Sequence, residues 1–289
     1  MVRVAAVQMA CSADREANVR RALDAVRDAA GQGAQVVLLP ELFETPYFCK
    51  DQDPRHFDLA RPHRGNATVA RFAALAAELA VVLPISFFEQ AGTAYFNALV
   101  VIDADGRELG LYRKSHIPDG PGYQEKFYFN PGDTGFRVWP TRYGALGVAI
   151  CWDQWFPEAA RVMALRGAEL LLYPTAIGSE PQDATLDSSG HWQRVMQGHA
   201  AANVMPLIAA NRIGREVGRD AEITFYGSSF IAGPTGELLA CADRERDAIL
   251  LADLDLAEIA RRRRAWGVFR DRRPDLYGAL GSLDGGETR

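Results

Sequence analysis

Short apolar runs alternate with amphipathic stretches along this chain, and that alternation limits the possible fold more than any other feature. The run from Val2 to Met9 predicts a strand, and the apolar residues spaced three and four apart after it predict a helix. Gly31-Gln32-Gly33 favours the end of that helix. The run 34–39 is apolar throughout, which is typical of a strand buried on both faces. The sequence therefore predicts an α/β fold.

The same pattern continues through the rest of the chain. A helix is expected from the turn after Cys151 to about Gly167, and Asp105-Gly106 favours a hairpin turn between two strands. No linker, repeat or low-complexity segment divides the sequence, so we expect one domain over 1–280 and a loose tail over 281–289. Further strands are predicted at 81–88, 95–103, 108–113, 145–150, 169–173, 206–211, 228–232, 238–241 and 248–253, and further helices at 66–79, 190–204 and 255–264.

Composition excludes several classes of protein. The 289 residues are 48% hydrophobic, which is enough for one large core, and a net charge of −5 disfavours nucleic acid and anionic membranes as partners. The amino terminus lacks a signal-peptide pattern, and the apolar stretch 73–88 is too short to cross a bilayer. We expect a cytoplasmic protein. The cysteines have no zinc-binding spacing: Cys11, Cys49, Cys151 and Cys241.

Three reactive residues each follow a predicted apolar strand: Glu41, Lys114 and Cys151. Sites in α/β sheets collect beyond the carboxyl ends of the strands, so we expect the three side chains to converge. Together they are chemically sufficient for covalent hydrolysis. The carboxylate can take the thiol proton, the cysteine can form the covalent intermediate, and the ammonium with the backbone N–H of Trp152 can hold an oxyanion.

Two further observations bear on these residues. Cys151 lies at a predicted strand-to-helix turn, where free backbone N–H groups and the helix dipole favour a thiolate. Only three of the 32 basic residues are lysines, namely Lys50, Lys114 and Lys126. A lysine in so arginine-rich a chain indicates a place where a compact ammonium fits and a guanidinium does not, although chance also explains the bias.

The motifs around these residues resemble the nitrilase (carbon–nitrogen hydrolase) superfamily. The matching segments are Leu39-Pro40-Glu41-Leu42-Phe43, Tyr112-Arg113-Lys114 and Ile150-Cys151-Trp152-Asp153, and the resemblance extends to about Leu280. It implies a four-layer α-β-β-α sandwich, a Glu-Lys-Cys triad, no metal or organic cofactor, and assembly as a homo-oligomer. It also implies a second glutamate near the nucleophile, which is Glu125 in the segment 122–127.

A finer resemblance is to the branch of this superfamily that hydrolyses N-carbamoylputrescine in polyamine biosynthesis. The segments 117–129, 174–183 and 194–200 carry it. It implies a small cationic ureido substrate, with Glu180 binding the distal ammonium. By the same resemblance, Ala176 belongs to the substrate site. We expect Tyr47 and Trp152 to line the pocket around the alkyl chain.

Alternatives remain open at the level of sequence. An amidase of N-carbamoyl amino acids would need a basic residue where Glu180 stands, because that substrate ends in a carboxylate. A catalytically silent assembly or binding protein on the same fold would not need a reactive Cys151. A cysteine–histidine hydrolase would use a histidine as base, and the candidates are His116, His191 and His199. The sequence also leaves open whether Glu125 transfers protons or only positions groups.

Overall fold

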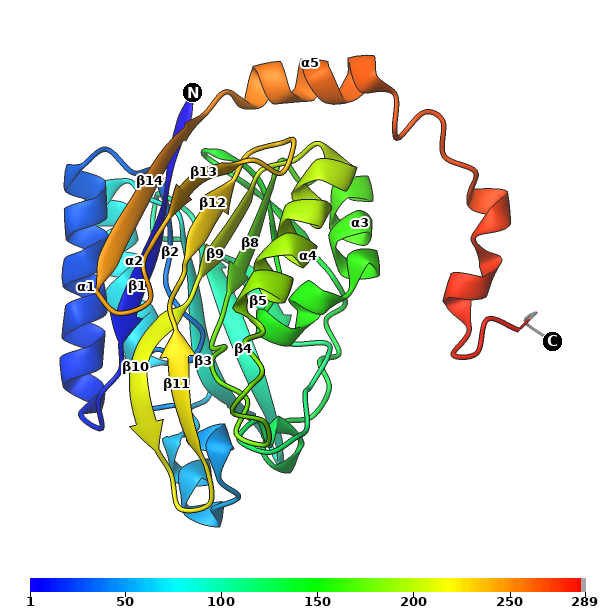
Figure 1. Cartoon of the computed structure of the whole chain (residues 1–289). Coiled ribbons are helices and arrows are strands. Elements are labelled where there is room, and N and C mark those ends of the chain that lie inside the picture. Colours follow the sequence, from blue (N-terminus) through cyan, green and yellow to red (C-terminus); the bar gives the residue numbers. More distant parts are fainter. Residues whose placement is uncertain (287–289) are drawn as a thin grey trace.

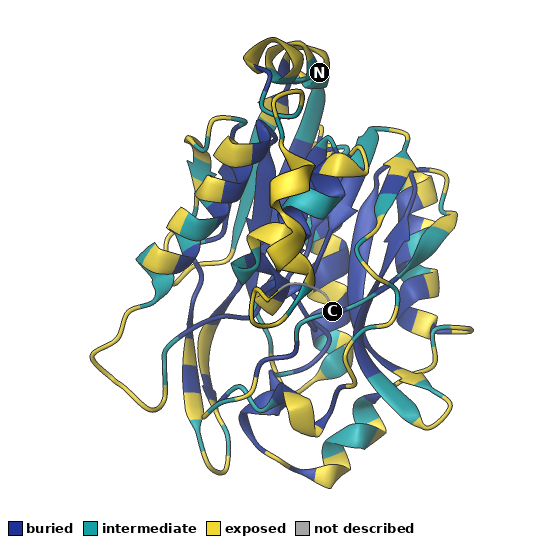
Figure 2. Ribbon diagram, turned by 90° about the vertical axis from the view of Figure 1, so that its right-hand side faces the viewer, coloured by how far each residue is buried: buried dark blue, intermediate teal, exposed yellow. Residues whose placement is uncertain are grey.

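The computed structural model describes residues 1–286 and arranges them as two β-sheets packed face to face between two layers of helices (Figure 1). This is the four-layer α-β-β-α sandwich that the family resemblance implies. Figure 2 shows the strands buried in the middle of the molecule and the exposed residues on the outer sides of the helices and in the loops. The buried strands therefore form a frame whose ends can present side chains at fixed positions.

The first sheet is built around β1 (Val2–Ala10). β14 (Ala248–Leu254) pairs antiparallel with one side of β1, and β2 (Val36–Leu38) pairs parallel with the other side. An antiparallel meander continues the sheet, because the amide of Val37 donates to the carbonyl of Val82 (3.1 Å) just before β3. The meander consists of β3 (Leu83–Ala91), β4 (Ala94–Ile102) and β5 (Glu108–Arg113).

The second sheet has the strand order β13-β12-β9-β8-β7-β6. Its three central strands, β7, β8 and β9, are parallel, because a helix connects each of them to the next. Its edge strands pair antiparallel with their neighbours. The strands are β6 (Val138–Thr141), β7 (Gly144–Val148), β8 (Leu170–Pro174), β9 (Leu207–Ala210), β12 (Phe230–Ala232) and β13 (Leu238–Cys241).

Alternation along β1 produces two cores from one strand. Val4 and Ala6 join the core shared with the second sheet, whereas Ala5 and Val7 join the core beneath the first pair of helices. The helices α1 (Arg15–Gly31) and α2 (Ala67–Leu79) cover the first sheet, and α3 (Pro157–Leu165) and α4 (Ser189–Asn203) cover the second. Short 3-10 turns lie at Phe48–Lys50, Pro54–Leu59, Glu125–Phe127, Cys151–Trp155, Pro274–Leu276 and Gly278–Gly281.

The turn and the helix predicted between Cys151 and about Gly167 are both present, as two separate segments. A 3-10 turn occupies Cys151–Trp155, and α3 begins at Pro157. Proline has no N–H to donate to a preceding turn but fits the first turn of a new helix, which explains the break. The cysteine therefore does not lie at the start of a long helix.

A hairpin absent from the sequence prediction projects from one end of the sandwich. Its strands are β10 (Arg212–Val217) and β11 (Glu222–Tyr226), which pair antiparallel. β10 also pairs parallel with the end of β1, where Met9 lies opposite Arg212. Figure 1 shows the hairpin beside the segment that follows β2.

The carboxyl-terminal segment leaves the body of the molecule. α5 (Leu256–Trp266) begins where predicted, with the Asp255 side chain accepting from the amide of Glu258 (2.9 Å). The chain beyond α5 extends away from both sheets (Figure 1). We call 267–286 the arm. Of the tail predicted at 281–289, residues 287–289 lie outside the described residues.

No helix within residues 1–286 is long and apolar enough to span a membrane.

Candidate active site

Lys114 lies at the centre of a buried cluster of charges. Its Nζ donates to Glu41 Oε1 (2.8 Å) and to both oxygens of Glu125 (2.9 and 2.7 Å). Glu41 follows β2, Lys114 follows β5, and Glu125 begins a 3-10 turn, so three distant segments meet here. All three side chains are almost completely buried. The structure therefore brings together three of the four residues that we predicted to be catalytic.

The cluster has unusual titration properties because it is both buried and charged. Burial acts to lower the pKa of Lys114, but the carboxylates of Glu125 and Glu41 outweigh it and raise that pKa well above its ordinary value. Burial raises the pKa of Glu125 to about 7, aided by the charge of Glu41 and opposed by Lys114. Lys114 is therefore a permanent cation, and Glu125 changes charge near neutral pH.

The two carboxylate oxygens of Glu41 have different surroundings. Its Oε1 also accepts from Asn97 Nδ2 (2.6 Å) on β4, whereas its Oε2 is buried and has no partner among the described residues. A buried carboxylate oxygen without a donor is costly unless a reacting group supplies one. Asn97 was not among the predicted site residues, although an amide within the apolar run 95–103 is a detectable signal.

Cys151 lies in a strained turn at the end of the β7 segment. Its φ is +40°, and its Sγ is 3.9 Å from the carbonyl oxygen of Ala176. The turn is fixed by Asp153, whose Oδ2 accepts from the amide of Ile150 (3.0 Å).

The turn does not favour the thiolate, contrary to our expectation. Burial raises the pKa of the Cys151 thiol, the negative charge of Glu41 raises it further, and Lys114 only partly opposes both. No long helix supplies a compensating dipole, since the turn after Cys151 is a short 3-10 segment. The resting sulfur is therefore a thiol and needs a neighbouring base before it can attack.

The three histidines have other partners. His116 Nδ1 lies 2.8 Å from Asp153 Oδ1, and His199 Nε2 lies 2.7 Å from the carbonyl oxygen of Gln154. The ring of His191 packs edge-on against Trp155. Within residues 1–286 no histidine is hydrogen-bonded to Cys151, so the geometry does not favour a cysteine–histidine hydrolase.

A pocket of about 420 Å³ opens onto the cysteine. Its wall contains Cys151, Glu125 and all four residues predicted to bind substrate: Tyr47, Trp152, Ala176 and Glu180. The Tyr47 hydroxyl donates to Glu125 Oε1 (2.7 Å), which links the wall to the buried cluster. Trp152 is the most exposed of these residues, at 38%.

The pocket wall is acidic. It contains Asp119, Glu125 and Glu180, and none of the described residues lining it is a lysine or an arginine. Glu180 is held in place, because its Oε1 accepts from Ser188 Oγ (3.1 Å) and its Oε2 accepts from Gln182 Nε2 (3.3 Å). Such a wall attracts a cation and repels a carboxylate.

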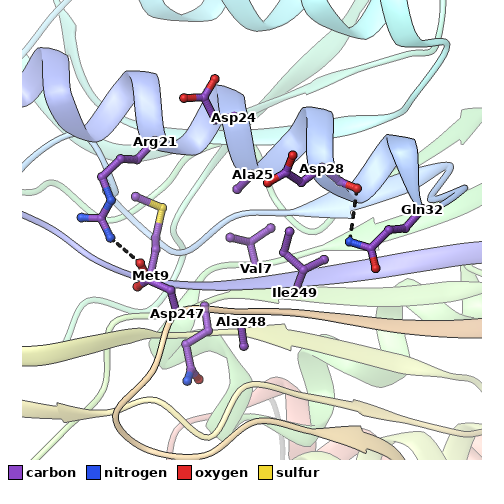
Figure 3. A pocket seen from close by; sticks show the side chains of 11 residues that line it. Val7, Met9, Arg21, Asp24, Ala25, Asp28, Gln32, Asp247, Ala248 and Ile249 are labelled. Carbon is purple, nitrogen blue, oxygen red and sulfur yellow. Dashed lines mark hydrogen bonds and ion pairs between the residues drawn. The ribbon is translucent and has the colours of Figure 1, made fainter.

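A second cavity, of about 480 Å³, lies between α1 and the paired strands β1 and β14 (Figure 3). Its charged residues are Asp24, Asp28 and the ion pair between Arg21 and Asp247 (2.7 Å). No cysteine, lysine or glutamate is among the residues that line it. The groups suited to covalent hydrolysis therefore gather at the pocket beside Cys151.

The chain matches the model of one protein family and is similar to proteins of known sequence and structure. The sequence model of a family described as carbon-nitrogen hydrolase matches residues 3–264. An N-carbamoylputrescine amidase of Solanum tuberosum is 61% identical, over 99% of this chain and 96% of the relative. A citrullinase of Francisella tularensis is 54% identical, over 96% of each chain. The crystal structure of a carbon-nitrogen hydrolase from Helicobacter pylori G27 matches with a TM-score of 0.92 and 42% identity, over 98% of this chain and 99% of that one.

Proposed function

Since this chain belongs to the carbon–nitrogen hydrolase family, we propose that it hydrolyses N-carbamoylputrescine to putrescine, ammonia and carbon dioxide. The observation that carries the proposal is the acidic pocket that opens onto Cys151, next to the Glu41–Lys114–Glu125 cluster. The identity of 61% to an N-carbamoylputrescine amidase supports the same substrate. Because putrescine is a polyamine precursor, we further propose a role in cytoplasmic polyamine biosynthesis.

The first half of the proposed reaction forms a covalent intermediate. Glu41 takes the proton of the Cys151 thiol through its free oxygen, and the sulfur attacks the ureido carbon. Lys114 and the backbone N–H of Trp152 stabilise the oxyanion; losing one such donor typically costs about 3 kcal/mol. The bond from carbon to the terminal nitrogen then breaks. That nitrogen takes the proton from Glu41 and leaves as ammonia, so a carbamoyl thioester remains.

The second half releases the product. Glu41 removes a proton from water, the oxygen attacks the thioester carbon, and the carbon–sulfur bond breaks. The sulfur recovers its proton from Glu41, and the released carbamate loses carbon dioxide to give putrescine. Throughout, Glu125 holds the Lys114 ammonium through two hydrogen bonds and keeps it beside the reacting carbon. Its role in this proposal is positioning rather than proton transfer.

Glu180 is the proposed partner of the distal ammonium. A pair of unit charges about 4 Å apart near a protein surface interacts by about 4 kcal/mol before desolvation is subtracted. Ser188 and Gln182 hold the carboxylate in place, so little side-chain entropy is lost when the cation binds. Tyr47 and Trp152 would contact the four-carbon chain between the two charged ends.

L-Citrulline is a second candidate, because one relative at 54% identity is a citrullinase. Citrulline has the same ureido group and the same four carbons between it and the ammonium, and it differs by a carboxylate on the carbon that bears the ammonium. The absence of lysine and arginine among the described residues of the wall leaves that carboxylate without a partner. We therefore place citrulline second.

Ammonia release decides among these substrates. Wild type and Cys151→Ala are assayed with N-carbamoylputrescine, L-citrulline, N-carbamoyl-β-alanine and a simple nitrile. We expect release from the first substrate, and none from any substrate in the variant. Release mainly from citrulline or N-carbamoyl-β-alanine would keep the Cys151 mechanism and overturn the substrate assignment. No release from any of the four would favour a silent protein on this fold.

We also propose that the protein is a homo-oligomer joined through the arm. Five large hydrophobic side chains at the end of α5 and along the arm are exposed: Trp266, Leu276, Tyr277, Leu280 and Leu283. Seven arginines fall within 256–275, although the whole chain has a net charge of −5. Four of these arginines lie on α5. The basic α5 and the exposed apolar side chains of the arm together suit the acidic remainder of a second copy.

A further inference from the structure

The β10–β11 hairpin holds the segment that carries Glu41 and Tyr47. Three side-chain contacts join them along the length of the hairpin. Arg212 donates to the segment at the base, and Glu216 accepts from the amide of Tyr47 in the middle. At the tip, Asp51 of the segment accepts from the amides of Arg219 (2.7 Å) and Asp220 (2.9 Å). These contacts therefore fix the position of the segment 41–51 relative to the hairpin.

Arg212 binds the main chain at Glu41 itself. Its Nη2 donates to the carbonyl oxygens of Glu41 (2.8 Å) and Leu42 (3.0 Å), and its Nη1 donates to that of Thr45 (3.3 Å). The guanidinium is completely buried. Leu42 has a φ of +47°, which a leucine adopts only when its surroundings impose it. The Arg212 contacts are among those that impose it.

Glu216 binds both Arg212 and the backbone of Tyr47. Its Oε1 accepts from Arg212 Nη1 (2.9 Å), and its Oε2 accepts from the backbone amide of Tyr47 (2.6 Å). Lys50 Nζ completes the arrangement by donating to the carbonyl oxygen of Tyr47 (2.9 Å) and to Glu216 Oε2 (3.4 Å). The buried charges of Arg212 and Lys50 thus share one carboxylate, and the backbone of Tyr47 is held on both sides.

The other strand of the hairpin holds the neighbour of Glu180. The amide of Ser179 donates to the carbonyl of Thr224 (2.9 Å), and Ser179 Oγ accepts from the amide of Thr224 (3.0 Å). The ring of Phe225 packs edge-on against Tyr47, 5.8 Å between centroids. One hairpin therefore contacts both the segment with Glu41 and the loop with Glu180.

We propose that Arg212 and Glu216 are positioning residues that fix Glu41 and Tyr47 relative to Lys114 and Cys151. The proposal deepens the proposed function and rests on it, because it assigns Glu41 as the base. Neither residue lines the pocket, so both act through the residues that they hold. A displacement of about 1 Å at a reacting group can cost about 100-fold in rate.

The test uses Arg212→Lys, Glu216→Gln and a matched control, Arg215→Met. Lysine keeps the charge of Arg212 but cannot reproduce the hydrogen bonds of the guanidinium to three carbonyls and a carboxylate. Glutamine keeps the shape of Glu216 and removes its charge. Arg215 lies on the same strand, pairs with Glu222 at the surface, and contacts nothing in the site.

Two measurements separate positioning from mere stability. For the first, we expect kcat with N-carbamoylputrescine to fall about 100-fold in Arg212→Lys, with KM changed less than about threefold, and we expect no change in Arg215→Met. The second is the rate of Cys151 alkylation by iodoacetamide against pH, followed on the Cys151 peptide without substrate. We expect slower alkylation near pH 7 and a profile displaced to higher pH in both hairpin variants.

The outcomes are distinct. Unchanged kcat per folded molecule and an unchanged alkylation profile, with only a lower melting temperature, would overturn the proposal. If Arg212→Lys does not fold, Glu216→Gln decides, since it preserves shape and leaves Arg212 in place. If the wild type releases no ammonia from N-carbamoylputrescine, the proposed function fails, yet the alkylation profiles still decide whether the hairpin positions Glu41.

Discussion

The hydroxyl of Tyr47 donates to the same Glu125 oxygen that accepts from Lys114. A residue of the pocket wall is therefore bonded directly to the buried charge cluster. This hydrogen bond favours the ionised form of Glu125, so it opposes burial, which is the main reason that the pKa of this group is raised to about 7. Substrate that contacts Tyr47 would consequently influence the charge of the cluster.

Replacing Tyr47 with phenylalanine should move the acidic limb of the pH–rate profile upward. In the proposed mechanism Glu125 is active when ionised, so activity is lost as pH falls through about 7. Loss of the hydroxyl removes a donor to the carboxylate, which raises the pKa of Glu125 by about one further unit. We expect kcat/KM to show its acidic limb about one pH unit higher. An unmoved limb would mean that another group titrates.

Replacing Cys151 with alanine should remove ammonia release altogether. Loss of a covalent nucleophile typically costs about 10⁴-fold or more in kcat. In native wild type, iodoacetamide should modify Cys151, and prior incubation with substrate should slow the modification. The buried Cys49 provides an internal control, because it should react only after denaturation. Labelling that spares Cys151 until denaturation would contradict its assignment as nucleophile.

Replacing Glu180 with glutamine should weaken binding without slowing chemistry. The change keeps the shape of the side chain and removes the charge opposite the distal ammonium. We expect KM for N-carbamoylputrescine to rise about 10- to 100-fold, while kcat changes less than about threefold. Glu222→Gln, on the exposed face of β11, is the matched control. Equal KM values in wild type and Glu180→Gln would show that the cation binds elsewhere in the pocket.

Removing the arm should dissociate the proposed oligomer. A chain ending at Gly267 keeps both sheets and α5 but loses four of the five exposed hydrophobic side chains named above, leaving only Trp266. Light scattering should give a multiple of the 31.7 kDa chain mass for the full chain and a smaller assembly for the truncated one. A monomeric full-length chain, or an oligomer that persists after truncation, would show that the arm does not form the subunit interface.

Periodicity in the sequence was sufficient for most of the fold. Apolar runs such as 34–39 and the capping residue Asp255 mark their elements through local interactions, which are readable without a structure. The hairpin at 212–226 was missed even though β11 alternates exposed and buried residues regularly. Its charged residues masked the strand pattern, and its pairing with β1 joins segments about 200 residues apart. Pairing between such distant segments produces no pattern in the local sequence of either strand.

The residues of the site also fall into two groups, those that local sequence predicts and those that only the fold brings together. Glu41, Lys114 and Cys151 could be predicted, because each follows a strand and the strand ends converge. Asn97 and Arg212 could not be assigned roles, because each acts on Glu41 from a strand whose position only the sheets define. The raised pKa of the Cys151 thiol was also beyond the sequence, since it depends mainly on burial.

The scarcity of lysine has a practical consequence for anyone who attaches this protein to a surface. Lys114 and Lys50 are buried, so Lys126 is the exposed lysine of the chain. Amine-reactive supports, crosslinkers and dyes should therefore modify Lys126 and the terminal amine of Met1. Lys126 directly follows Glu125 in the chain. Coupling through lysine would tether the protein by the turn that holds its catalytic cluster, and a tag at the amino terminus would leave that turn free.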